Sequence, residues 1–154
     1  MINILIKVDR CHTIAILDDN SIHLYNESVE DFMDKYLLNI LRTYETSIIR
    51  GKFISGISKY KAPLAYHSIN GLNILVPINS TRKENCIWIS LNYFLKYSRD
   101  EFEQLTGHRI SFYQWGRLFQ ICLDCQKRFN FKLTVPNNFT SISKKELKEL
   151  LNNF

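Results

Sequence analysis

The residues of this chain best suited to metal or thiol chemistry are its four cysteines and four histidines. Cys122 and Cys125 have the Cys-x-x-Cys spacing of half a zinc or redox site. A zinc site needs a second pair of Cys or His ligands at comparable spacing, and the sequence has none. We therefore expect both thiols to pack in the core, where free cysteine behaves as a small hydrophobe. We expect neither a metal nor a cofactor.

The other two thiols, Cys11 and Cys86, could form a nucleophile with a histidine, but no spacing selects one Cys/His pair. The acidic cluster at 100–103 falls in the first turn of an expected helix, where carboxylates serve capping and the helix dipole. The chain has no P-loop, no Gly-rich dinucleotide motif and no hydrolase Ser motif. We expect that it is not an enzyme, with a small thiol enzyme as an alternative.

Positive charge is concentrated in the middle of the chain. The net charge is +5, but residues 42–99 carry +7, whereas residues 1–41 carry −4 and residues 100–154 carry +2. Such asymmetry favours an anionic partner, because contacts with phosphates supply most of the non-specific affinity for nucleic acid. A solvated basic surface would have the same composition.

The apolar pattern predicts strands at 2–8, 12–17 and 22–25, and then a helix at about 29–43 that begins at the capping residue Ser28. Short β-rich runs follow over 48–76. The dipeptide Asn70-Gly71 predicts a type I′ turn between Leu64–His67 and Leu72–Val76. A polar loop at 77–85 leads into a strand at 86–91.

Three helices are expected after the strands. Ser98 begins a short one that Gly107 ends, Ser111 begins a longer one, and Ser143 begins the last. The expected apolar stripe of the longer helix is Phe112, Trp115, Phe119, Cys122 and Phe129, and that of the last helix is Leu147, Leu150, Leu151 and Phe154.

The sequence thus predicts one α+β domain over residues 1–154, with an antiparallel β-rich centre, one helix before it and two or three amphipathic helices after it. We expect no signal peptide, and the sequence contains no continuous apolar stretch of membrane-spanning length. We expect a soluble cytoplasmic protein with reduced cysteines and no membrane contact.

The most distinctive string is Ser-Thr-Arg-Lys-Glu-Asn-Cys-Ile-Trp-Ile-Ser at 80–90. It is a polar, basic loop that runs into an apolar strand, with Arg82 and Lys83 at the strand end and Trp88 in the core. The string resembles the S-T-R-x-x-x-C-x-W-I-S motif of the ComK family of competence transcription factors. Lys61 and Pro63 in a K-x-P element, the apolar run ending at Pro77, and an aromatic-rich helix after Ile110-Ser111 extend the resemblance over roughly residues 45–130.

The resemblance implies a transcription activator that binds paired A·T-rich boxes of DNA-uptake genes, largely through the minor groove, as a homo-oligomer. The segment 131–136 faintly resembles the family segment that a proteolytic adaptor recognises, and a plain strand or loop there is the favoured alternative. A narrow A-tract minor groove attracts inserted Arg or Lys, which agrees with the charge pattern. The alternative is a protein-binding regulator that has lost DNA binding. We expect the DNA-contacting residues to be Arg50, Lys52, Lys59, Lys61, Ser80, Thr81, Arg82 and Lys83.

Overall fold

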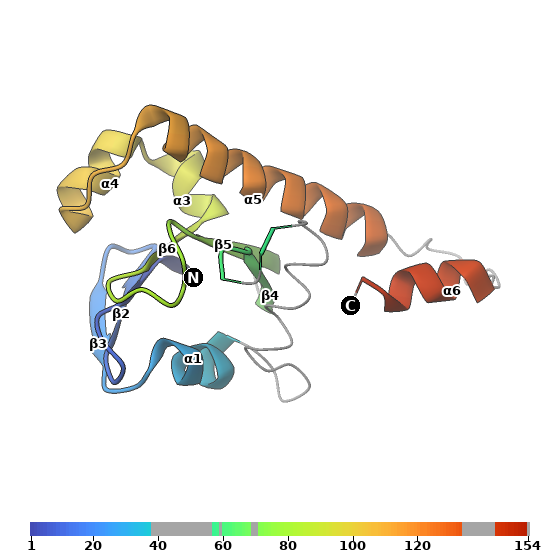
Figure 1. Ribbon diagram of the computed structural model, residues 1–154, viewed down its shortest axis with the longest axis horizontal. Coiled ribbons are helices and arrows are strands. Elements are labelled where there is room, and N and C mark those ends of the chain that lie inside the picture. Colours follow the sequence, from blue (N-terminus) through green and yellow to red (C-terminus); the bar gives the residue numbers. More distant parts are fainter. Residues whose placement is uncertain (38–56, 59, 69–70, 134–143, 154) are drawn as a thin grey trace.

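Six antiparallel strands form one sheet in the order β3-β2-β1-β6-β5-β4 (Figure 1). The computed structural model describes residues 1–37, 57–58, 60–68, 71–133 and 144–153. The strands are β1 (Ile2–Lys7), β2 (Thr13–Leu17), β3 (Ile22–Tyr25), β4 (Leu64–Ser68), β5 (Gly71–Pro77) and β6 (Ile87–Ser90). The α+β prediction with an antiparallel sheet is confirmed.

The pairing of β1 with β6 joins two three-stranded units. The first unit, β1 to β3, comes from the acidic N-terminal segment, and the second, β4 to β6, comes from the basic middle segment. Their junction pairs Ile4 with Ile89 and Leu5 with Trp88. Because β-branched and aromatic side chains favour pleated, buried surfaces, these apolar strands pair stably only when both faces of the junction are covered.

Helices cover the two faces of the sheet. The helix α1 (Val29–Phe32) and the π-helical turn η1 (Met33–Leu37) lie on one face, where Phe32 packs with Leu5 and Trp88. The other face carries α3 (Leu91–Lys96), α4 (Arg99–Thr106) and the long α5 (Phe112–Leu133), which contribute Phe94, Phe102 and other core residues (Figure 1). A last helix, α6, spans Lys144–Leu151.

Local capping explains where the helices start and stop. Ser28 accepts a hydrogen bond from the Asp31 amide at the start of α1. Ser98 and Glu101 form a reciprocal capping box at α4, which ends at Gly107 in the left-handed conformation with φ +70°. Ser111 accepts from the Gln114 amide at the start of α5. These cap positions are all as the sequence predicts.

Three sequence predictions about elements need correction. The predicted hairpin of β4 and β5 exists, but its register pairs Ser68 with Gly71. Gly71, with φ +108°, is therefore the first residue of β5 and does not lie in the turn. Asn70 is outside the described residues. Helix α3 was not predicted, because its N-cap Ser90 is followed at the third position by Tyr93 and not by Glu or Gln. The helix predicted at 29–43 is described only to Leu37, and its second half is π-helical.

Two predicted apolar faces are also partly wrong. Phe112 is 73% exposed and lies against the Arg99 guanidinium, so it does not belong to the core. Leu147 and Leu151 of α6 are likewise exposed. Trp115 and Phe119 pack at the edge of the core. The side chains of Phe129, Leu150 and Phe154 lie outside the described residues. Of the helices in the described ranges, none has both the length and the apolar composition to cross a bilayer.

Ile4 and Ile22 provide a matched test of the sheet, since the register places both in one cross-strand row with Ile16 between them. Ile4 is 0% exposed and Ile22 is 62% exposed. We expect Ile4→Ala to lower the free energy of unfolding by about 2–5 kcal/mol, because it leaves a cavity, and Ile22→Ala to change it by less than about 0.5 kcal/mol. Urea unfolding measures both, and equal losses would contradict the described sheet.

Candidate nucleic-acid interface

The β5–β6 loop, residues 78–86, is tied to the sheet at both ends. The Ile78 amide donates to the Ile87 carbonyl at 2.9 Å, and the Lys7 amide donates to the Cys86 carbonyl at 2.9 Å. Asn85, just before Cys86, has φ +61°, a conformation that Asn tolerates better than most residues. The loop therefore leaves and re-enters the sheet at fixed points.

Thr81 anchors the middle of this loop. It is 6% exposed, and its amide donates to the Tyr60 carbonyl at 2.7 Å. Its own carbonyl accepts from the Lys7 ammonium at 3.2 Å. Thr81 thus serves as a buried fixing point and not as a surface contact, although the sequence predicted it as a DNA-contacting residue.

Arg82, the next residue, stacks on an aromatic ring. Its guanidinium carbon lies 3.5 Å from the centroid of the Tyr60 ring, and its side chain is exposed. Such a contact restricts the guanidinium plane while leaving its edge directed away from the ring. Among the ion pairs between described residues, none involves Arg82.

The structure brings together five of the eight predicted residues. Ser80 accepts from the Arg82 amide through its hydroxyl and from the Lys83 amide through its carbonyl, which closes a tight turn. Lys83 is exposed, and Lys61 is exposed next to Tyr60. The predicted residues Arg50, Lys52 and Lys59 lie outside the described part of the chain.

The sequence reading missed Lys7 and Tyr60. Lys7 comes from the acidic N-terminal segment, and only the pairing of β1 with β6 carries it to this loop. Tyr60 directly precedes Lys61 of the K-x-P element. An aromatic residue next to a predicted DNA-contacting lysine is the sequence signal that could have identified it. With these two residues the edge holds four positive side chains: Lys7, Lys61, Arg82 and Lys83.

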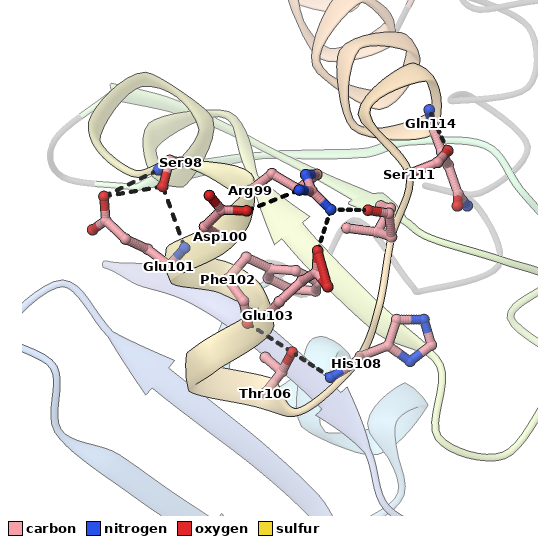
Figure 2. Close-up of polar contacts among 11 residues, drawn as sticks. Ser98, Arg99, Asp100, Glu101, Phe102, Glu103, Thr106, His108, Ser111 and Gln114 are labelled. Carbon is pink, nitrogen blue, oxygen red and sulfur yellow. Dashed lines mark hydrogen bonds and ion pairs between the residues drawn. The ribbon is translucent and has the colours of Figure 1, made fainter.

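The start of α5 contacts the same loop. The side-chain amide of Gln114 donates to the Ile78 carbonyl at 2.9 Å. Arg99, the first residue of α4, donates to the Ile110 carbonyl at 2.9 Å and pairs with Asp100 and Glu103 (Figure 2). Its guanidinium carbon also lies 3.7 Å from the centroid of the Phe112 ring. Arg99 therefore fixes the direction in which α5 begins.

The cysteines are buried, except for Cys11. Burial raises the pKa of Cys86 to about 12, against the smaller opposing effects of the Asn79 backbone and the Lys7 charge. Burial likewise raises the pKa of Cys125 to about 12 and places the pKa of Cys122 well above its usual value. The prediction that Cys122 and Cys125 pack in the core is confirmed. Such thiols stay protonated at neutral pH, which does not suit a thiolate nucleophile or metal ligand.

Acidic, His and Cys side chains do not converge elsewhere in the described ranges. No group of three or more that could hold a metal ion occurs among those residues. The chemistry that the loop offers is therefore electrostatic: exposed cations, one of them held on an aromatic ring, at the end of two strands.

Residues 3–113 match the family model described as ComK protein, which covers well over half of the chain. The matched range includes all six strands, the β5–β6 loop and the start of α5. No curated protein and no solved structure matches the chain.

The burial of three thiols predicts their reactivity. In the folded protein at pH 8, a disulfide reagent should modify the exposed Cys11 quickly and the buried Cys86, Cys122 and Cys125 only as the chain unfolds. Absorbance of the released thiolate counts the reacting groups, and Cys11→Ser is the control that should abolish the fast phase. Any fast thiol in that control would contradict the described packing.

Proposed function

The chain belongs to the ComK family of competence-type transcription regulators, and from this membership we propose that it activates transcription by binding A·T-rich duplex DNA through the β5–β6 loop. The observation that carries the proposal is the guanidinium of Arg82 held 3.5 Å over the Tyr60 ring, beside exposed Lys83 and Lys61. The proposal involves no catalysis, no metal and no cofactor.

A restrained arginine at a loop tip suits a narrow groove. An A-tract has a narrow minor groove with enhanced negative potential, which attracts an inserted arginine. Stacking on Tyr60 restricts the Arg82 side chain before binding, so less conformational entropy is lost when its edge reaches the bases. The buried Thr81 holds the backbone at the base of this side chain.

The surrounding lysines suit phosphates. Lys83 and Lys61 carry compact charges on flexible stems, and neither forms an ion pair among the described residues. Phosphate contacts position a protein on DNA, whereas groove contacts provide sequence preference. We assign Arg82 to the groove and the two lysines to phosphates.

The family resemblance extends the proposal in three respects. We propose that copies of the chain assemble on paired A·T boxes at promoters of DNA-uptake genes, that the protein acts in the cytoplasm, and that a proteolytic adaptor contacts the segment 131–136. Residues 131–133 of that segment form the end of α5, and residues 134–136 lie outside the described residues.

Salt dependence provides the first test of DNA binding. We expect several cations, among them Arg82, Lys83 and Lys61, to displace counterions from DNA phosphates. A plot of the logarithm of the association constant against the logarithm of salt concentration should then have a slope of about −0.9 per phosphate neutralised. Fluorescence anisotropy with a labelled A·T-rich duplex at several salt concentrations gives this slope. A flat dependence would favour the alternative, a protein-binding regulator on the same fold.

Arg82 provides the second test, because groove and phosphate roles give different results. We expect Arg82→Ala to cost about 1–3 kcal/mol on A·T-rich duplex and to narrow the preference over G·C-rich duplex. Arg82→Lys should keep the salt slope but lose the preference for A·T-rich over G·C-rich duplex, because the lysine ammonium lacks the planar, forked set of donors of the guanidinium group. Lys83→Ala is the matched comparison and should weaken both duplexes about equally.

Melting temperatures of the same variants separate binding from folding. Arg82 is exposed, so its variants should melt within a few degrees of the parent protein. If Arg82→Ala melts much earlier and loses affinity only in proportion, its role is structural. Unchanged affinity on both duplexes would remove Arg82 from the interface.

A further inference from the structure

The exposed face at the start of α5 carries positive charge outside the β5–β6 loop. Arg109 and Arg117 are both exposed, and neither forms an ion pair among the described residues. Tyr113, one turn before Arg117, is 81% exposed. We call Arg109, Tyr113, Gly116 and Arg117 the α5 face.

The α5 face lies beside the proposed loop interface. Gln114 is hydrogen-bonded to the Ile78 carbonyl, where the loop begins. Arg117 follows Gln114 by three residues, and side chains at that spacing are neighbours on a helix surface. Arg117 is therefore on the flank of α5 that meets the loop, and Tyr113 borders it on the solvent side.

Gly116 is an unexpected residue at this position. A glycine inside a helix costs roughly 0.5–1 kcal/mol relative to alanine, so it needs a structural reason. Among the described residues, a Cβ at Gly116 would meet nothing within 4 Å, and the glycine has no positive φ that would require it. The packing of the described residues therefore gives no reason for the absence of a side chain, whereas close approach of a ligand to the helix would.

The acidic group nearest along this helix lies outside the α5 face. Asp124 lies about two turns after Arg117, and its carboxylate accepts a hydrogen bond from the Gln120 side chain at 2.9 Å. The charged side chains of the α5 face itself, Arg109 and Arg117, are both positive and exposed, so the face favours an anion.

The start of α5 is also held rigidly. Arg99 donates to the Ile110 carbonyl and contacts Glu103, and Figure 2 shows it reaching from α4 toward the turn that leads to Ser111. Its stacking on Phe112 adds a second restraint. A surface with a fixed position loses little entropy on binding an extended partner.

We infer that the α5 face is a second DNA-contacting surface, which binds the phosphate backbone of the same duplex that the β5–β6 loop contacts. Arg117 and Arg109 neutralise phosphates, and Gly116 lets the sugar-phosphate backbone approach the helix closely. This inference rests on the proposed function, because it extends the same duplex onto a neighbouring element.

Arg117→Ala tests the charge. We expect about a fivefold to tenfold loss of affinity for labelled duplex and a salt slope smaller by about one unit, equally on A·T-rich and G·C-rich DNA, because a phosphate contact carries no base preference. Lys127→Ala removes a charge from the same helix beyond the α5 face and is the matched control. It should lose less than twofold.

Gly116→Ala and Gly116→Leu test whether DNA approaches the helix closely at this position. Melting temperature and DNA affinity are both measured, because the inference predicts that the first rises while the second falls. Both variants should raise the melting temperature, because alanine and leucine favour the helix and have open space. Both should also weaken DNA binding, leucine more than alanine. Higher stability with undiminished affinity would overturn the inference.

Parallel measurement of Arg82→Ala separates the two proposals. If Arg82→Ala weakens DNA binding and Arg117→Ala does not, the α5 face does not contact DNA, and the proposal that the β5–β6 loop binds DNA still holds. If the parent protein does not bind duplex DNA at all, both proposals fail. If the variants of the α5 face alter self-association but leave affinity for a single A·T box unchanged, the face binds a second copy and the inference is overturned.

Discussion

The pairing of β1 with β6 is the interaction on which the rest of this structure depends. It joins a three-stranded unit from the acidic N-terminal segment to one from the basic middle segment, through three residue pairs that include Leu5 with Trp88. Both faces of the junction are buried, since Ile4 and Ile89 pack toward α3 to α5 while Leu5 and Trp88 pack toward α1. The hydrogen bond from the Lys7 amide to the Cys86 carbonyl continues the pairing beyond the strands. The junction thereby places Lys7 under the β5–β6 loop, where its ammonium holds Thr81.

The same pairing explains how an acidic segment can adjoin a cationic interface without neutralising it. The β2–β3 turn contains Asp18 and Asp19, and the register pairs Leu17 with Ile2, at the end of β1 away from Lys7. Five residues of strand span roughly 17 Å, which exceeds the screening length of about 8–10 Å at 0.1–0.15 M salt. Two acidic residues nearer the loop side have partners: Asp9 contacts the His12 ring, and Glu27 pairs with Lys35. The loop itself contains one acidic residue, the exposed Glu84, against Arg82 and Lys83, so it remains net positive toward an external anion.

Local signals in the sequence predicted much of this structure, and long-range pairing accounts for most of what they did not predict. Helix caps at Ser28, Ser98 and Ser111 depend on neighbouring residues only, so they could be read directly. The polar loop with exposed Arg82, and buried Trp88 in the following strand, likewise follow from a change in apolar pattern. Lys7 joins the loop through a partner about eighty residues away, which no local pattern reveals. Phe112 was assigned to the core from its helical spacing, because spacing alone does not show that Arg99 holds its ring at the surface.

Hydrogen exchange of the full chain, with and without an A·T-rich duplex, tests most directly whether the β5–β6 loop is the DNA interface. The account predicts slower exchange at amides in peptides covering 78–86 when the duplex is present. It predicts unchanged exchange in the β2–β3 hairpin, 13–25, which β1 separates from β6 in the sheet. A G·C-rich duplex at the same salt concentration should protect the loop less. Protection of the hairpin with no change in the loop would contradict the account.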